Sequence, residues 1–308
     1  MQLQPRTQPT FYFIGVTTGK SSINRIFPRW MQIIGQDVQL AGIDVPLHAP
    51  AETYRAVIEH IKNDPLVRGA LVTTHKIDLY NAARDLFDAV DANGRLCGEL
   101  SCIARRDGKL LGFAKDPLSS GKTWEHFVPP GHFASTSAEV LCFGSGGAAV
   151  ATTVYLSQAA DHPSHVTLVD VSSERLNHAH TIHQQLKTDI CFDYVLNADP
   201  YDNDARLSSL PPGSVVINGT GMGKDLPGSP ITAAGIFPQD GYVWEFNYRG
   251  ELNFLQQAKR QAMMRNLTVE DGWVYFLHGW TLVVAEALQF DLTPALFNRL
   301  DKAAQEYR

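Results

Sequence analysis

The chain has 308 residues, of which 44% are hydrophobic and 19% charged, and its formal net charge is −6 at pH 7. This composition is typical of a soluble globular protein with room for two domains. The acidic balance and the lack of a basic stripe exclude nucleic acid as a partner, and no apolar run is long enough to span a membrane. The first residues contain no apolar signal region, and the four cysteines lack metal-ligand spacing, so we expect a cytoplasmic protein without a metal.

The first third of the chain alternates between apolar strands and helical segments. Strands are expected at residues 11–16, 38–45 and 66–73, with a helical segment after each of them. This alternation predicts an open α/β domain. A β-hairpin is expected at residues 100–113, because Asp107-Gly108 is a strong turn signal between two short apolar segments.

A glycine-rich turn follows the apolar strand Val140–Phe143. The segment Gly144-Ser-Gly-Gly-Ala-Ala149 fits the pattern G-x-G-x-x-A and leads directly into a helical segment. In a dinucleotide-binding turn the first glycine permits the tight bend, the second lets a diphosphate approach the backbone, and the small last residue lets the helix pack closely. We assign this role to the following residues: Gly144, Ser145, Gly146, Gly147 and Ala148.

The next strand, at residues 165–170, ends in Asp170, about 20 residues after the glycines. A carboxylate at this position binds the ribose 2′-hydroxyl and repels a 2′-phosphate, so we expect NAD, with NADP less favoured. A later strand at Val215–Asn218 leads into the loop Gly219-Thr-Gly-Met-Gly223. Ligands bind at the carboxyl ends of such strands, so Asn218 and its loop are candidate cofactor residues.

We expect two open α/β domains that are separated by a cleft. Residues 1–116 form a substrate-binding domain, which helices in the segment 245–308 complete, and residues 117–244 form a Rossmann dinucleotide-binding domain. The boundary is expected at Lys115-Asp116-Pro117.

Several stretches, in the same order along the chain, resemble the shikimate dehydrogenase family. Gly69-Ala-Leu-Val-Thr-Thr-His-Lys76 is similar to the family's N-V-T-x-P-x-K segment. Gly98 to Asp116 resembles G-A-V-N-T…D-G-x-L-x-G-x-N-T-D, and Asn218 to Gly223 resembles N-A-T-x-x-G. Phe246-Asn247 resembles a Y-N pair, and Asp271-Gly272…Leu277-His278 resembles D-G-x-x-M-L-v-h. The resemblance covers essentially the whole chain.

This resemblance implies a dehydrogenase that transfers a hydride between a nicotinamide and a ring carbon bearing a hydroxyl. By position, the family's catalytic lysine and aspartate fall on Lys76 and Asp116. Such a pair suits the chemistry, because oxidation of an alcohol requires loss of the hydroxyl proton as the hydride leaves. By itself, Lys76 could also be a solvated helix residue, and Asp116 could cap a helix before Pro117. The resemblance also implies that Thr220 and Met222 face the nicotinamide.

The family's substrate ligands are replaced at most positions. Its serine pair falls in the segment containing Ser21, where S-x-S-P is not recovered, and its glutamine falls on Gly279. Its first two asparagines fall on Leu71 and Ser101. A site built to bond polar groups discriminates strongly against losing them, so we expect a related hydroxylated ring, larger or less polar, in place of shikimate. The rival enzyme hypotheses are a quinate-type activity and a true shikimate dehydrogenase with relocated ligands. Candidate substrate residues are Ser21, Thr73, Ser101 and Gly279.

An alternative hypothesis is a catalytically inactive nucleotide sensor of the same fold. The retained Lys76 and Asp116 favour the enzyme, since a sensor has no need of a proton-transfer pair. We expect a small-molecule substrate and a monomer or homodimer.

Overall fold

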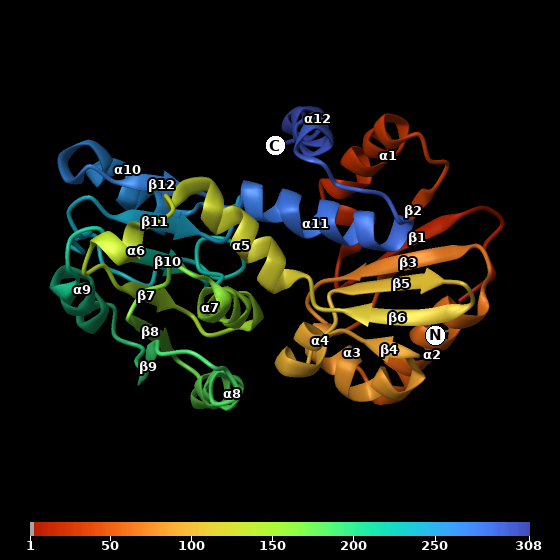
Figure 1. The fold of residues 1–308 in the computed structure, drawn as a ribbon, viewed down its shortest axis with the longest axis horizontal. Coiled ribbons are helices and arrows are strands. Elements are labelled where there is room, and N and C mark those ends of the chain that lie inside the picture. Colours follow the sequence, from red (N-terminus) through yellow and green to blue (C-terminus); the bar gives the residue numbers. More distant parts are fainter. Residues whose placement is uncertain (1–2) are drawn as a thin grey trace. The chain divides into compact units, whose positions relative to one another are not determined.

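The computed structural model describes residues 3–308 and confirms the α/β class, with two six-stranded sheets in the described chain (Figure 1). The residue contacts divide the chain into two units. Unit 1 contains the described residues up to Lys115 together with Gly279–Arg308, and unit 2 contains Asp116–His278. Unit 2 is thus one continuous segment inserted into unit 1.

Unit 1 is built on a mixed sheet in the strand order β2-β1-β3-β5-β6-β4. The strands are β1 (Thr10–Gly15), β2 (Gln39–Asp44), β3 (Val67–Val72), β4 (Ala89–Val90), β5 (Cys102–Arg106) and β6 (Lys109–Phe113). Strand β1 pairs in parallel with β2 and β3, while β5 is antiparallel to both β3 and β6. The β5–β6 turn has positive φ at Asp107 (49°) and Gly108 (76°), so the expected hairpin is confirmed.

Helices cover both faces of this sheet. They are α1 (Ile23–Ile34), α2 (Ala51–Asn63), α3 (Lys76–Ala83), α4 (Ala92–Cys97), the second part of α11 (Trp273–Leu288) and α12 (Pro294–Gln305). One face packs Tyr12 and Ile14 among buried residues of α2 and α3. On the other face Phe11 stacks on α1, and Phe13 lies edge-on to Trp280 of α11, with ring centroids 4.9 Å apart.

Unit 2 is built on a fully parallel sheet in the order β12-β11-β10-β7-β8-β9. The strands are β7 (Val140–Phe143), β8 (His165–Asp170), β9 (Cys191–Leu196), β10 (Val215–Asn218), β11 (Tyr242–Glu245) and β12 (Thr268–Glu270). The strand order reverses direction between β7 and β10. In open parallel sheets this switch point is where the loops separate and a nucleotide binds.

Helices also cover both faces of the second sheet. They are α5 (Asp116–Phe127), α6 (His132–Ser135), α7 (Gly147–Gln158), α8 (Ser173–His183), α9 (Pro200–Ser209) and α10 (Asn253–Arg265). Leu207 of α9 and Phe254 of α10 belong to the core on one face, and Trp124 of α5 contacts Trp244 on the other. Helices α5 and α7 pack side by side (Figure 1). No helix in residues 3–308 combines the length and apolarity that a membrane crossing requires.

The segment that follows residue 245 differs from our expectation. We expected all of 245–308 to complete the first domain, but residues up to His278 make their contacts in unit 2. The reason is β12, which pairs in parallel with β11 and extends the second sheet by one edge strand. Only Gly279–Arg308, with the second part of α11 and all of α12, belongs to unit 1.

Candidate dinucleotide-binding and substrate sites

The predicted phosphate-binding turn lies between β7 and α7, and Gly147 and Ala148 are the first residues of that helix. Gly144 has φ +94°, and a Cβ there would lie 2.6 Å from backbone atoms of Gly219. At Gly146, the N-cap of α7, a Cβ would meet nothing within 4 Å. The first turn of the helix has no acidic residue. The space beside Gly146 at the helix N-terminus is therefore open, which suits a diphosphate.

Asp170 ends β8 as expected, but its carboxylate is already bonded within the chain. Its Oδ2 accepts hydrogen bonds from the Ser145 backbone N–H (2.7 Å) and hydroxyl (3.0 Å). Its Oδ1 accepts from the Ser172 N–H at 2.9 Å, and the residue is only 5% exposed. Asp170 and Ser145 therefore shape the turn in the described structure.

A largely apolar hollow opens at the carboxyl ends of these strands, within unit 2. It is lined by the following residues: Phe143, Gly144, Val169, Asp170, Val171, Arg175, Asn197, Ala198, Pro200, Asn203, Thr220, Met222, Leu226, Ser229 and Pro230. Four of the predicted cofactor residues are among them: Gly144, Asp170, Thr220 and Met222.

Arg175 is the residue of this hollow that our sequence reasoning missed. It lies in the first turn of α8, is exposed, and has no carboxylate within ion-pair distance among residues 3–308. An arginine near the end of the second strand is the group that accommodates a 2′-phosphate. The signal was available, since Arg175 follows Asp170 by five positions.

Asn218, at the end of β10, holds the loop that carries Thr220 and Met222. Its side-chain oxygen accepts hydrogen bonds from the Thr220 N–H (3.2 Å) and hydroxyl (2.7 Å). The Thr220 hydroxyl in turn accepts from the Met222 N–H at 3.1 Å. These contacts order the loop at the edge of the hollow.

Glu245, at the end of the neighbouring strand β11, is a second residue that we did not single out. It is fully buried, and its Oε2 accepts a hydrogen bond of 2.6 Å from the Asn218 side-chain nitrogen. Burial raises the pKa of the Glu245 carboxyl to about 7, although hydrogen bonds from Asn247 and Asn218 act to lower it.

The predicted substrate residues of unit 1 have different environments. Thr73 follows β3, and its hydroxyl donates to the Ile14 carbonyl oxygen at 3.3 Å; Lys76 opens α3 three residues later. Ser101 is buried, and its hydroxyl accepts the Lys115 N–H at 2.7 Å. Ser21 is half-buried in the loop before α1, and a Cβ at Gly279 would meet nothing within 4 Å.

One group of possible metal ligands occurs away from the hollow. Ligand atoms of His165, Cys191 and Asp193 lie within 4.8 Å of one another, at the starts of β8 and β9. His165 Nε2 and Asp193 Oδ2 already make a contact of 2.7 Å, and Cys191 and Asp193 are exposed. The strands place this group opposite to the loops that line the hollow.

Comparison with known proteins finds shikimate dehydrogenases among the sequence relatives. No family model matches the chain. A shikimate dehydrogenase (NADP(+)) of Streptococcus sanguinis is 25% identical over 236 residues, which are 75% of this chain and 75% of that protein. A shikimate dehydrogenase (NADP(+)) of Streptococcus thermophilus is 24% identical over 179 residues, or 57% of this chain, and the match spans 59% of that protein's length.

Solved structures share the fold over nearly the whole chain. A shikimate dehydrogenase in complex with NADP+ has a TM-score of 0.74 at 18% identity, and covers 97% of this chain and 95% of its own. A quinate dehydrogenase from Corynebacterium glutamicum in complex with NAD has a TM-score of 0.75 at 15% identity, over 97% and 99%. The chain is thus similar in sequence to shikimate dehydrogenases and shares the fold of shikimate and quinate dehydrogenases.

The expected preference for NAD was wrong. Both shikimate dehydrogenases matched in sequence are NADP(+) enzymes, and the shikimate dehydrogenase structure above contains NADP+. The geometry gives a physical reason, because the Asp170 carboxylate that we assigned to the ribose is bonded to Ser145 and Ser172. The exposed Arg175 guanidinium lines the same hollow.

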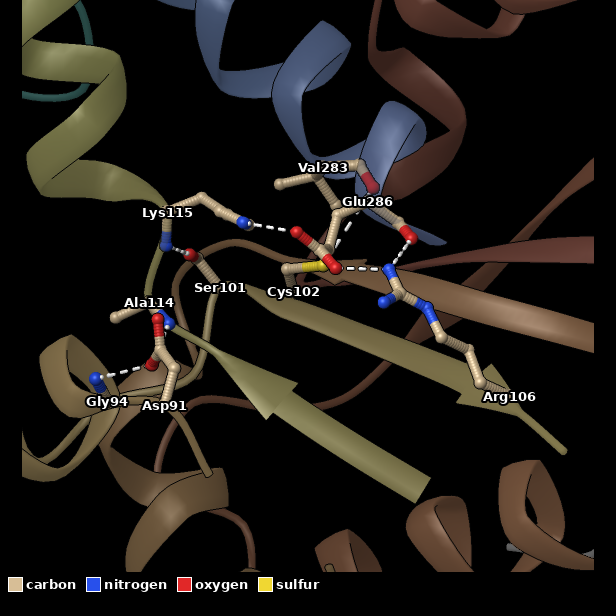
Figure 2. Close-up of polar contacts among 9 residues, drawn as sticks. All are labelled: Asp91, Gly94, Ser101, Cys102, Arg106, Ala114, Lys115, Val283 and Glu286. Atoms are coloured by element: carbon tan, nitrogen blue, oxygen red, sulfur yellow. Dashed lines mark hydrogen bonds and ion pairs between the residues drawn. The ribbon is translucent and has the colours of Figure 1, made fainter. Parts of the chain in front are cut away.

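The two residues before Asp116 differ from the shikimate dehydrogenase pattern that this segment resembles. In place of N-T, the chain has Ala114-Lys115, and Figure 2 shows Lys115 directed to Glu286 of α11. Lys115 Nζ lies 2.5 Å from one Glu286 oxygen, and Arg106 of β5 bonds the other. Burial acts to raise the pKa of Glu286, but the two cations lower it below its ordinary value. All three residues lie in unit 1.

Proposed function

We propose that the chain is an NADP-dependent oxidoreductase. It transfers a hydride reversibly between the nicotinamide and a hydroxyl-bearing carbon of a small ring substrate. Lys76 and Asp116 form its proton-transfer pair.

The nucleotide hollow is the observation that carries this proposal. It is lined by Gly144 of the turn that leads to the open helix terminus at Gly146, by Thr220 and Met222 of a loop, and by Arg175, which has no ion-pair partner among residues 3–308. A diphosphate fits the first, a nicotinamide the second and a 2′-phosphate the third. Residues with these three roles support a phosphorylated dinucleotide over a simple mononucleotide.

The bound cofactor supplies or accepts the hydride. In the oxidative direction Lys76 takes the hydroxyl proton as the hydride leaves the carbon, and in the reductive direction it returns that proton to the developing alkoxide. Asp116, at the start of α5, accepts a hydrogen bond from a second hydroxyl of the ring. Thr73 and Ser21 contribute further polar contacts to the substrate.

The substrate differs from shikimate, because the residues that bind polar groups of the ring in the family pattern are replaced in this chain. Ser101 is buried and bonded to the Lys115 backbone, and Leu71 is buried in β3, so neither offers the amide that the family pattern has there. Gly279 has open space in place of a glutamine side chain. These differences support a ring that is bulkier or less hydroxylated near Gly279. Among the described residues, no contact favours the inactive sensor.

Fluorescence titration with NADPH and NADH tests the cofactor assignment. Replacing Arg175 with Gln is expected to weaken NADPH binding about tenfold, by loss of about 1.4 kcal/mol, and to change NADH binding little. Arg206→Gln, an exposed arginine of α9, is the matched control. An unchanged ratio of the two dissociation constants in Arg175→Gln would remove Arg175 from the proposal.

Initial rates with a panel of hydroxylated ring acids, including shikimate and quinate, test the reaction. Lys76→Met and Asp116→Asn are expected to lose turnover while they keep NADPH binding. Full turnover in either variant would contradict the assigned proton-transfer pair.

A further inference from the structure

Glu245 is a buried carboxylate without a cationic partner. It accepts three hydrogen bonds: from the Asn247 N–H (2.9 Å) and side-chain nitrogen (2.7 Å) on Oε1, and from the Asn218 side-chain nitrogen on Oε2. No lysine, arginine or histidine in residues 3–308 pairs with it. A charge buried in this way is unfavourable for stability by itself, so its retention calls for a further reason.

The carboxylate determines the orientation of Asn218. A carboxylate oxygen can only accept, so the Asn218 amide must direct its nitrogen to Glu245 and its oxygen to the other side. That oxygen then accepts both donors of Thr220, and the Thr220 hydroxyl accepts the Met222 N–H. A continuous series of hydrogen bonds therefore connects Glu245, through Asn218 and Thr220, with the loop at the nucleotide hollow.

We infer that Glu245 is a positioning residue for the cofactor, which acts by orienting the Asn218 amide and so ordering the loop from Gly219 to Met222. The inference rests on the proposed dinucleotide site. It assigns to Glu245 no contact with substrate or cofactor, since the residue is fully buried.

Isosteric substitutions separate this role from packing. In Glu245→Gln the oxygen must stay with the Asn247 N–H and side-chain nitrogen, because a nitrogen there would face the backbone donor. The new amide nitrogen therefore faces the Asn218 amide nitrogen, and if Asn218 flips, its nitrogen faces the Thr220 N–H instead. Either arrangement sets donor against donor. Adding Asn218→Asp restores the order, because the aspartate accepts from the introduced glutamine amide on one side and from Thr220 on the other. The double variant has the same number of carboxylates as the parent and loses only the 3.4 Å contact of Asn218 to the Met222 carbonyl oxygen.

The experiment measures NADPH dissociation constants and amide hydrogen exchange for the parent chain, both single variants and the double variant. Glu245→Gln is expected to weaken NADPH binding about tenfold or more and to speed exchange in the peptide that covers residues 219–223. Asn218→Asp, which sets two buried carboxylates against each other, is expected to do the same. The double variant is expected to recover binding to within about threefold of the parent, with slow exchange. Glu139→Gln, before β7, is the control.

The inference is overturned if Glu245→Gln matches the parent in both measurements, or if the double variant is as impaired as the single variants. A parent chain that binds neither NADPH nor NADH would refute the proposed function instead. In that case hydrogen exchange still tests whether Glu245 orders the loop, because the exchange measurement needs no cofactor.

Discussion

Two glycines of the turn after β7 differ in what an added methyl group would meet. At Gly144 the backbone has φ +94°, which L-residues rarely adopt, and a Cβ would lie against the Gly219 backbone at 2.6 Å. At Gly146 the backbone is extended, with φ −71° and ψ 179°, and the space beside it is open. Gly144 is thus needed for the fold of the turn, and Gly146 for the close approach of a diphosphate.

Alanine substitutions are expected to separate these roles. Gly146→Ala should keep the melting temperature of the parent and weaken NADPH binding about tenfold, because its methyl group occupies space that the diphosphate needs. Gly144→Ala should lower the melting temperature, because the turn must move away from Gly219. Calorimetry and NADPH titration measure the two effects. Parent-like NADPH binding in Gly146→Ala would place the diphosphate elsewhere.

The position of Asp170 could be predicted from the sequence, but its hydrogen bonds could not. Its position after the second strand of the nucleotide unit was predictable from spacing and hydrophobic pattern. Its bonding was not, because the donors belong to Ser145, which is 25 residues away, and to the turn at Ser172. The same holds for Glu245, whose neighbour Asn218 lies on another strand. Sequence pattern places such residues at the strand ends, and only the sheet brings their donors to them.

At the scale of elements, α11 is attached to the β5–β6 hairpin through Glu286. The carboxylate of Glu286 lies between Lys115 and Arg106, and the three side chains are only 19%, 16% and 30% exposed (Figure 2). Nearby, the Cys102 thiol donates to the Val283 carbonyl oxygen at 3.8 Å. The strand end that precedes Asp116 is thereby held against a helix from the far end of the chain.

Glu286→Gln is expected to lower the free energy of unfolding by about 1–3 kcal/mol, because Lys115 and Arg106 then lack a counter-charge in a half-buried site. Glu125→Gln breaks the pair with Lys122, in which both side chains are about half exposed, and should change it by less than about 1 kcal/mol. Urea denaturation measures both. Equal effects of the two substitutions would mean that the Glu286 group is no more than a surface ion pair.

Most elements of the fold were predictable from periodicity and turn signals, including strands β7, β8 and β10 of unit 2 and the β5–β6 hairpin. Strand β12 was missed, and the reason is physical. Thr268–Glu270 has three residues, two of them polar, and forms an edge. Such a strand forms because β11 offers unpaired backbone groups. This is a property of the sheet, and it cannot be inferred from the residues of the segment itself.

At the scale of the whole molecule, pH is expected to affect stability and cofactor binding in opposite directions. Burial raises the pKa of Glu245 to about 7, and the nearby Asp271 carboxylate also raises it. The folded chain therefore retains a proton that the unfolded chain loses near pH 4.5. The contribution of Glu245 to the free energy of unfolding is fully present below pH 4.5 and falls by about 3 kcal/mol as the pH rises through 7. Binding needs the ionised form and should strengthen over the same range.

Unfolding free energies between about pH 5 and 8 check the stability half of this prediction. The difference between the parent chain and Glu245→Gln should shift in favour of the variant as the pH rises, because the amide does not ionise. A constant difference across this range would show that Glu245 does not titrate there.

The insertion of one unit into the other has a consequence for the order in which a ribosome delivers the parts. Residues 116–278 emerge as one run and can fold as soon as they are free of the tunnel. The earlier-made residues of unit 1 must wait for Gly279–Arg308, because Trp30 of α1 donates to the Leu300 carbonyl oxygen of α12 and Phe13 packs on Trp280. Synthesis thus favours a nascent chain whose nucleotide unit matures first, while Phe13 of the first sheet stays exposed until Trp280 and the last helices arrive.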